Sequence, residues 1–322
     1  MESMFVRVNG MRLGVVIQGG DKPRPYPTRL RKTFRSRVGA GLVPALDTSS
    51  TLVMLHGFTG SAAGWGRHLE ALAACGLRVI AFDLPGHGQS DAPADPRRYA
   101  MEYCQEDILT ALRELGVSQG QAVLLGYSMG GRIALYTAFS GFFRALVLES
   151  ASPGLDDPIE REKRRRDDEE LAASIERDGV AAFVARWEKL PLFASQNALP
   201  REVREALHRQ RLDNRASGLA QSLRGAGTGV QPSLFPRLPL LNIPVLLMAG
   251  ELDTKFAAIA RSMALALPQA QLRIVPGAGH AVHLERPEEF VSLVGDFMNH
   301  LAPASSAGHS SITDKHENRR NI

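Results

Sequence analysis

Residues 122–135, AVLLGYSMGGRIAL, place a serine between a short apolar run and the start of a helical pattern. The G-x-S-x-G sequence around Ser128 is typical of a tight turn from a buried strand into a helix, with the serine hydroxyl exposed above the sheet. This context of strand, turn and helix is the one in which a G-x-S-x-G sequence carries a nucleophile, although the motif alone would be weak evidence. The alternative is that Ser128 only caps the helix, which would apply if no histidine and carboxylate followed in suitable places.

Apolar runs in the rest of the chain alternate regularly between strand-like and helix-like patterns. Short runs of Val, Leu and Ile without polar alternation are typical of strands that are covered on both faces. The fold class is therefore predicted to be α/β, with a mostly parallel sheet flanked by helices. The expected strands are 51–55, 77–82, 122–127, 144–150, 244–250 and 272–277. The expected helices lie near 64–75, 102–115, 129–140, 256–267 and 287–300.

Changes in residue pattern divide the chain into segments. Residues 156–235 carry amphipathic helical patterns and no strand, which predicts an all-helical cap inserted after the sixth strand. We expect this cap over the carboxyl ends of the strands, where open α/β sheets place their sites. The other segments are an N-terminal β-hairpin at 1–20 that turns at Asn9-Gly10, a basic Pro-rich insertion at 21–50, two parts of the core at 51–155 and 236–301, and a tail at 302–322 that we expect to be disordered.

The positive charge of the chain is concentrated in the insertion. Residues 21–50 contain seven Lys or Arg and two Asp, a net charge of +5, whereas the whole chain has a net charge of +4. The remainder is nearly neutral, so we expect no nucleic-acid-binding face. The insertion is interpreted as a flexible, solvated loop, and contact with a polyanion or a protein partner is the alternative.

Other features limit the location of the protein. No segment has the roughly 18 consecutive apolar residues of a membrane span, and the first ten residues lack the layout of a signal peptide. We therefore expect a cytoplasmic protein without a membrane span. Cys75 and Cys104 fall within expected helices, without the spacing of metal ligands or of a disulfide framework, which predicts buried, reduced thiols. The sequence does not indicate the oligomeric state.

Candidate partners for Ser128 follow two later strands. A serine hydroxyl needs a histidine to accept its proton and a carboxylate to orient that histidine. Asp253 lies in GELDTKF after the strand 244–250, and His280 lies in GAGHAVHLERP after the strand 272–277, which is the order Ser, Asp, His expected for this fold. Three competing residues, which are interpreted as less suitable, are Asp83, Glu251 and His283, the last as a support of its loop.

Two backbone amides are candidates for an oxyanion hole. The sequence LHGFTGS at 55–61 follows the first core strand after the insertion. In an α/β-hydrolase fold this loop supplies one N–H donor and the residue after the nucleophile supplies the other. These donors would belong to Phe58 and Met129.

Arginines indicate the charge of the substrate. Arg132 lies one helical turn after Ser128, and 12 of the 14 basic residues in 156–224 are arginine, in a segment that also has 14 acidic residues. The guanidinium group pairs with a carboxylate through two parallel hydrogen bonds, which lysine cannot do. We expect a small-molecule substrate with several carboxylates, although at least eight of these arginines are interpreted as solvated helix-surface residues.

The chain resembles the 2-succinyl-6-hydroxy-2,4-cyclohexadiene-1-carboxylate synthase family of the α/β-hydrolase fold. The motifs that carry the resemblance span the core and the cap and leave out residues 21–50 and the tail. They are HGFTGS, GYSMGGR, LESASPGL, EREKRRRDD, WEKLPLFAS, RLDN, GELDTKF and GHAVHLERP. Haloalkane dehalogenases and epoxide hydrolases are excluded because they carry an aspartate where this chain has Ser128.

The resemblance implies a lyase of menaquinone biosynthesis. In this family a triad led by serine removes a proton from a cyclohexene that carries a succinyl group and an enolpyruvyl ether, and pyruvate is expelled. Where many relatives have Asn after the triad histidine, this chain has Ala281. The resemblance implies no metal and no organic cofactor. The residues implied to bind substrate carboxylates or to line the pocket are Arg132, Arg164, Arg211, Tyr127 and Trp187, with Arg165 or Arg166 as alternatives to Arg164.

Two other functions remain open from the sequence. An ester or C–C bond hydrolase would use the same residues through an acyl-serine intermediate. A ligand receptor without catalysis could keep the same scaffold, because one fold serves many functions.

Overall fold

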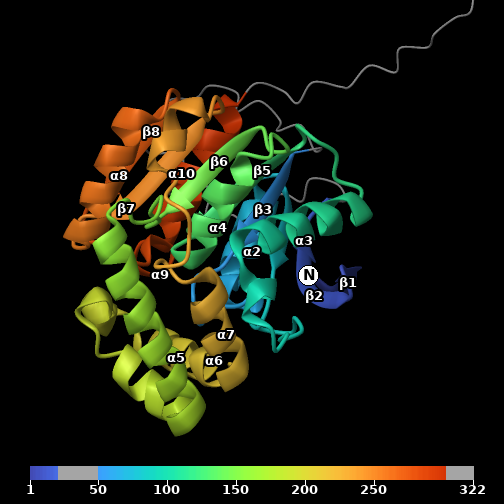
Figure 1. The fold of residues 1–322 in the computed structure, drawn as a ribbon. Helices are drawn as coiled ribbons and strands as arrows, with labels where there is room; N and C mark the ends of the chain where they lie inside the picture. The colour runs from blue at the N-terminus through green and yellow to red at the C-terminus, as the bar shows by residue number, and fades with distance from the viewer. Residues whose placement is uncertain (21–49, 302–322) are drawn as a thin grey trace, which may run out of the picture.

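The computed structural model describes residues 1–20 and 50–301, which form an eight-stranded sheet (Figure 1). The strand order is β1-β2-β4-β3-β5-β6-β7-β8. Strands β1 and β2 form an antiparallel hairpin, β2 pairs with β4 in antiparallel fashion, and all later pairs are parallel. The strands are β1 (Glu2–Val8), β2 (Met11–Gln18), β3 (Thr51–Leu55), β4 (Arg78–Phe82), β5 (Ala122–Tyr127), β6 (Ala145–Glu149), β7 (Val245–Gly250) and β8 (Ala270–Val275).

Helices cover both faces of the sheet, which explains the apolar composition of its strands. In β3, Val53 and Leu55 belong to the core on one face, while Leu52 and Met54 belong to the core on the other. Each of these side chains is fully buried and contributes roughly 1.5–3 kcal/mol to stability. One face packs against α3 (Met101–Glu114), α4 (Met129–Ala138) and α8 (Thr254–Ala266), and the other against α2 (Arg67–Ala74) and α10 (Pro287–His300). The predicted α/β class with a mostly parallel sheet is confirmed.

The chain between β6 and β7 is described throughout and contains helices and no strand. Its first helix, α5 (Pro158–Trp187), begins where Asp157 accepts hydrogen bonds from the N–H groups of Ile159 and Glu160. Gly179, with a φ of 81°, interrupts this helix. The remaining helices are α6 (Arg201–Leu212), α7 (Ala216–Ala226) and the 3-10 helices Pro191–Ala198 and Phe235–Leu240.

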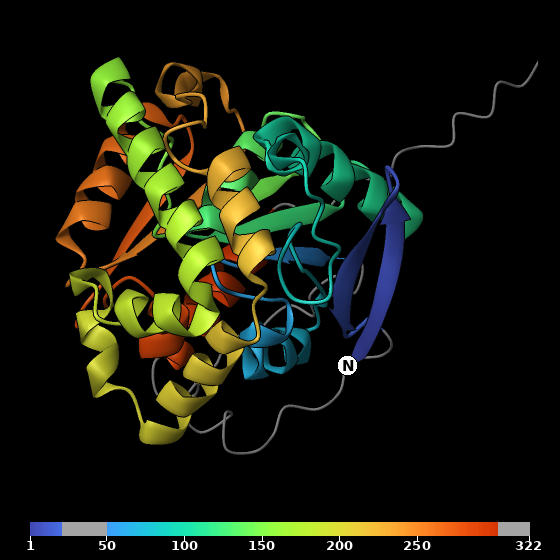
Figure 2. The same cartoon turned by 60° about the horizontal axis from the view of Figure 1, so that its bottom comes forward.

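These helices lie across one end of the sheet (Figure 2). Helices α5 and α7 share a small core of their own, with Phe183 and Leu219 fully buried in it. The helical segment 156–235 therefore packs around apolar residues of its own. Another part of its surface faces the ends of the strands.

The structure differs from the sequence-based expectation in several local features. The helix expected at 64–75 is divided into a 3-10 helix (Ala63–Trp65) and α2, because Gly66 between them has a φ of 49°. Cys75 follows the end of α2 and is only half-buried, so the prediction of a buried thiol is wrong there, whereas Cys104 is buried within α3. A short helix, α9 (Val282–Glu285), was not expected.

Two predictions concern segments outside the described residues. These are the flexible insertion at 21–50, of which the structure describes Ser50 alone, and the disordered tail at 302–322. In the ranges 1–20 and 50–301, no helix is both long enough and apolar enough to cross a membrane.

Candidate active site

Ser128 lies in the turn between β5 and α4 in a conformation unusual for a residue with a side chain. Its φ is 52°, and its backbone N–H donates to the carbonyl oxygen of Glu149 at 2.8 Å. The glycines of the motif allow the chain to approach itself closely here: a Cβ atom on Gly126 would overlap the carbonyl oxygen of Gly130. Because larger residues cannot fit, the sequence G-x-S-x-G is required by the local geometry.

The structure brings the three predicted triad residues together. Nε2 of His280 lies 3.0 Å from Oγ of Ser128, and Nδ1 of His280 lies 2.6 Å from Oδ2 of Asp253. A carboxylate only accepts hydrogen bonds, so Nδ1 carries the proton and Nε2 is free to accept the serine proton. Asp253 begins α8, where its other oxygen accepts the N–H of Phe256 at 3.1 Å. Both Asp253 and His280 are buried.

The competing residues have other partners. Oε2 of Glu251 accepts the N–H of Gly277 at 3.1 Å in an exposed position. Asp83 accepts backbone N–H groups from its own loop and from residue 62. His283 bonds to Glu149 and not to Ser128. None of the three takes the place of His280 or Asp253.

The loop after β3 presents a free backbone amide near Ser128. His56 holds this loop, because its Nδ1 donates to the carbonyl of Gly57 at 2.8 Å while its Nε2 accepts the N–H of Leu84 at 3.0 Å. Burial lowers the pKa of His56 to about 4, so it is neutral at pH 7. In the described part of the chain, the backbone N–H groups of Phe58 and Met129 donate to no acceptor. Two such donors could stabilise an oxyanion.

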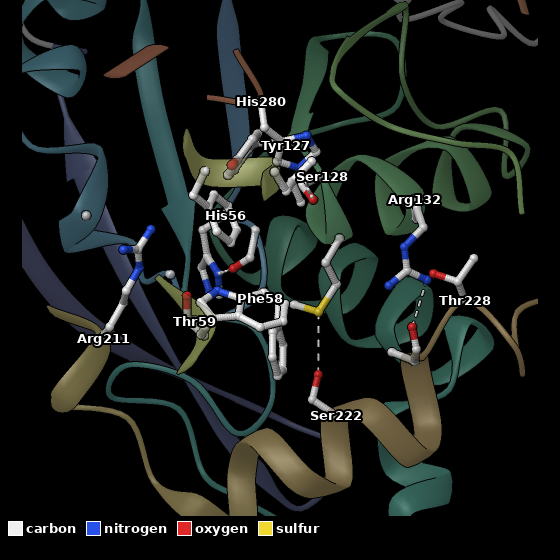
Figure 3. Close-up of a pocket in the computed structure, with 18 of the residues that line it drawn as sticks. His56, Phe58, Thr59, Tyr127, Ser128, Arg132, Arg211, Ser222, Thr228 and His280 are labelled. Carbon is white, nitrogen blue, oxygen red and sulfur yellow. Dashed lines mark hydrogen bonds between the residues drawn. The ribbon is translucent and has the colours of Figure 1, made fainter. Parts of the chain in front are cut away.

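A cavity of about 400 Å³ lies between the core and the helical segment 156–235. It is lined by Ser128 and His280, and the Arg132 and Arg211 side chains lie on opposite sides of it in Figure 3. Every residue predicted to bind substrate or to form the oxyanion hole lines this cavity: Phe58, Tyr127, Met129, Arg132, Arg164, Trp187 and Arg211.

Arg132 is a buried cation without a carboxylate partner in the described residues. Its Nη1 donates to the carbonyl oxygen of Ala226 and to Oε1 of Gln231, both at 2.8 Å (Figure 3 shows the first of these bonds). Both acceptors are neutral, and among the described residues no acceptor contacts Nη2 or Nε. Burial, with the nearby charge of Arg164, lowers the pKa of Arg132 to about 10, which leaves it charged at pH 7. The carboxylate of Asp168 acts on this pKa in the opposite direction but forms no hydrogen bond with Arg132, so an anion entering the cavity would meet a cation with no carboxylate bonded to it.

The other two predicted arginines have acidic partners. Nε of Arg164 donates to Oδ1 of Asp168 at 2.8 Å, and Arg164 is partly exposed. Nη1 of Arg211 donates to Glu188 at 2.9 Å and its Nη2 donates to Gln196 at 3.0 Å. These two arginines therefore retain only part of their capacity for a further anion.

The structure also separates the alternatives at 164–166. Arg165 and Arg166 line a second cavity, of about 300 Å³, whereas Arg164 lines the cavity that contains Ser128. Arg165 pairs with Glu162 on the surface of α5. Arg164 is therefore the arginine of the three that a ligand near Ser128 could reach.

Sequence reasoning missed several polar residues around Arg132. Gln231 is fully buried and orients the Arg132 guanidinium, and Thr228 and Ser222 line the same part of the cavity. They belong to α7 and the following loop, where no motif marks them, so only the tertiary structure identifies them. Within residues 1–20 and 50–301, no group of three His, Cys, Asp or Glu side chains could hold a metal ion.

Comparisons with known proteins identify the family of the chain. The Alpha/beta hydrolase family matches residues 52–293. A protein of Bacillus subtilis (strain 168), named as a 2-succinyl-6-hydroxy-2,4-cyclohexadiene-1-carboxylate synthase, is 43% identical over 257 residues, which are 79% of this chain and 92% of its own. The enzyme of that name from Serratia proteamaculans (strain 568) is 34% identical over 250 residues, 77% of this chain and 92% of its own.

Solved structures are also similar to this chain. MenH from S. aureus superimposes with a TM-score of 0.75 at 36% identity, covering 79% of this chain and 94% of its own. A thermophilic esterase from Thermogutta terrifontis superimposes with a TM-score of 0.72, but at 23% identity it indicates the fold alone. The chain belongs to the 2-succinyl-6-hydroxy-2,4-cyclohexadiene-1-carboxylate synthase family of the α/β-hydrolase fold.

Proposed function

We propose that this chain is a carbon–oxygen lyase of menaquinone biosynthesis. It would convert 2-succinyl-5-enolpyruvyl-6-hydroxy-3-cyclohexene-1-carboxylate into 2-succinyl-6-hydroxy-2,4-cyclohexadiene-1-carboxylate and pyruvate. Membership of the family supports the reaction. The observation that supports this substrate most directly is Arg132, a buried cation that lines the cavity of Ser128 and has only neutral partners among the described residues. The substrate carries three carboxylates, and one of them would supply the missing negative charge.

The chemistry follows from the two compounds. The C2–H and C5–O bonds of the ring break, and the ring double bond at C3 is replaced by double bonds at C2 and C4. The C5 oxygen leaves as enolpyruvate, which gains one proton at its methylene carbon to become pyruvate. The protein must therefore supply a base for the C2 proton and stabilise the negative charge that develops on the succinyl carbonyl oxygen.

Ser128, His280 and Asp253 are proposed to act together as this base. The Ser128 Oγ would accept the C2 proton as its own proton passes to Nε2 of His280, 3.0 Å away. Asp253, 2.6 Å from Nδ1, would stabilise the imidazolium that forms. Serine would thus act toward hydrogen and not toward a carbonyl carbon, and no covalent intermediate would form.

The amides of Phe58 and Met129 are proposed as the oxyanion hole. Removal of one well-placed donor of this kind typically costs about 3–4 kcal/mol of transition-state stabilisation. Arg132, Arg164 and Arg211 would hold the carboxylates, while Tyr127 and Trp187 would line the pocket. These contacts would hold the ring so that its C2–H bond, and no carbonyl carbon, faces Oγ of Ser128.

A hydrolase that works through an acyl-serine is the alternative, and two measurements on the cyclohexene substrate separate it from the lyase. The lyase should release pyruvate, with a primary isotope effect when C2 carries deuterium and chemistry limits the rate. Rapid quenching should give no added mass on the peptide that contains Ser128. An acyl adduct without an isotope effect would overturn the proposal.

A further inference from the structure

A buried carboxylate outside the proposed triad lies between the turn that carries Ser128 and the loop that carries His280. Glu149 is the last residue of β6 and is fully buried. Its carbonyl oxygen accepts the N–H of Ser128 at 2.8 Å, in the turn that carries the nucleophile. Its side chain reaches in the other direction, toward the loop that carries His280.

The Glu149 carboxylate is held by His283 through several contacts. Oε1 accepts the backbone N–H of His283 at 3.0 Å and lies 2.8 Å from Nδ1 of the same residue. Oε2 lies 3.0 Å from that nitrogen. Because a carboxylate only accepts, Nδ1 of His283 is the donor. His283 follows His280 by three residues, so this carboxylate fixes the start of α9 directly after the loop of His280.

Tyr127 joins the same assembly. In the parallel register of β5 and β6, Tyr127 lies opposite Glu149. The Tyr127 ring packs edge to face on the His283 ring, with 4.7 Å between centroids, and lies 5.5 Å from the His280 ring. The aromatic ring thus contacts both histidines, and the pair of Glu149 and His283 restrains it from one side.

Other bonds hold the His280 loop in its fold without reference to Ser128. Glu285 accepts the N–H groups of Gly279 and Ala281, at 2.6 and 3.3 Å. These bonds close the loop on itself, whereas the Glu149 carboxylate joins the start of α9 to β6, the strand paired with the one that leads into Ser128. Loss of the Glu149 contacts should therefore leave the loop folded but free to shift relative to the nucleophile.

We propose that Glu149 and His283 are positioning residues that set the distance between Ser128 and His280. Glu149 does not line the cavity, so it acts through His283 and Tyr127, which do. The inference rests on the proposed catalytic role of Ser128 and His280. A displacement of about 1 Å at a catalytic contact can lower the rate roughly 100-fold.

Three variants distinguish the effect of the Glu149 hydrogen bonds on the rate from the effect of its charge and from its contribution to the stability of the fold. Glu149→Gln keeps an acceptor oxygen for His283, whereas Glu149→Leu removes it. Glu149→Leu/His283→Phe removes both side-chain partners and keeps an aromatic ring on Tyr127, so that no buried side-chain donor is left unpaired if the single variant does not fold. Asp107→Asn is the matched control, because Asp107 is also a buried carboxylate with side-chain donors but does not line the cavity.

Two rate constants are measured for each variant. One is the single-turnover rate constant of pyruvate release with enzyme in excess. The other is the rate constant at which a fluorophosphonate labels Ser128, where the serine oxygen bonds to phosphorus, fluoride leaves and His280 accepts the proton. The amplitude of this labelling reports the folded fraction separately, and steady-state assays of pyruvate release give KM. The second rate constant does not depend on the natural substrate, so wild-type protein that is labelled but releases no pyruvate would contradict the proposed function and still test the pair.

We expect both rate constants to fall about 10- to 100-fold in Glu149→Leu and in the double variant, with KM within twofold of wild type. Glu149→Gln should stay within threefold, and Asp107→Asn should lose stability but keep both rates. Rates within twofold of wild type in the double variant, with only a lower amplitude or melting temperature, would overturn the inference. Equal losses in Glu149→Gln and Glu149→Leu would also overturn it, since the charge and not the bonds would then matter.

Discussion

Replacement of Arg132 by lysine tests how the cavity recognises anions. Nη1 of Arg132 is already used by Ala226 and Gln231, so the free Nη2 and Nε atoms form one edge of the guanidinium. This edge can bind a carboxylate through two parallel hydrogen bonds. A lysine keeps the positive charge but offers one compact ammonium group, which cannot bond to the two fixed protein acceptors and to both carboxylate oxygens.

The expected loss follows from the bonds that disappear. Lysine at position 132 would forgo one hydrogen bond between charged groups, worth about 1.5–3 kcal/mol. Since 1.36 kcal/mol corresponds to a factor of ten, kcat/KM should fall about 10- to 150-fold. The carboxylate contact is made in the ground state as well as in the transition state, so most of this loss should be a rise in KM with little change in kcat.

Pyruvate release can be followed continuously with a coupled dehydrogenase for Arg132→Lys and for a matched control, Arg165→Lys. Arg165 lies in the helical segment, pairs with Glu162 and lies outside the cavity of Ser128, so its replacement should leave kcat/KM unchanged. Thermal unfolding of both variants checks that the protein remains folded. A kcat/KM for Arg132→Lys within twofold of wild type would refute the role of Arg132 in carboxylate binding.

Three further perturbations have defined outcomes. Asp253→Asn should lower kcat about 10⁴-fold because His280 would lose the group that fixes its tautomer, and a loss under tenfold in a kcat assay would contradict this. Burial lowers the pKa of His56 to about 4 and the pKa values of His68 and His87 to about 3. Below pH 6.5 the unfolded chain therefore binds more protons than the folded chain. The free energy of unfolding has its full value above that pH and should fall by up to about 2 kcal/mol per histidine at pH 5. Equal urea midpoints at pH 7 and pH 5 would be inconsistent with this. Gly130→Ala should lower stability by about 1–3 kcal/mol, seen as a lower melting temperature, because its Cβ would overlap main-chain carbonyl oxygens, and an unchanged melting temperature would exclude the overlap.

The order of strands and helices could be predicted because it depends on local pattern. The run 52–55 is apolar at every position since both faces of β3 are covered, and its short length favours a strand over a helix. Ser128, Asp253 and His280 could be proposed for a related reason. Each follows a strand of the parallel sheet, and the carboxyl ends of such strands meet at one edge, so residues far apart in sequence come together.

Features that depend on contacts between distant segments could not be predicted. Gln231 bonds to Arg132 from the end of the helical insertion, 99 residues away, and nothing in its neighbours marks it as polar and buried. Glu149 ends a strand and reads as an ordinary acidic residue at a strand end, although its carboxylate lies between two loops of the site. Periodicity describes which face of an element is apolar, but it does not describe which polar partner a buried side chain meets.

The proposed role of the arginines would explain how a hydrolase fold can support an elimination. An activated serine oxygen attacks whatever atom is held against it, and His280 can accept the proton in either case. What changes the outcome is therefore the orientation of the substrate, which we expect to depend on the cations that line this cavity at a distance from Ser128. Arg132 bonds only to neutral acceptors among the described residues, through Nη1, so its Nη2 and Nε atoms remain for an anion, whereas Arg211 already pairs with Glu188. We expect Arg132, one helical turn from the nucleophile, to bind a substrate carboxylate first. The distance within the substrate between that carboxylate and the C2–H bond then determines where the C2–H bond lies relative to Ser128.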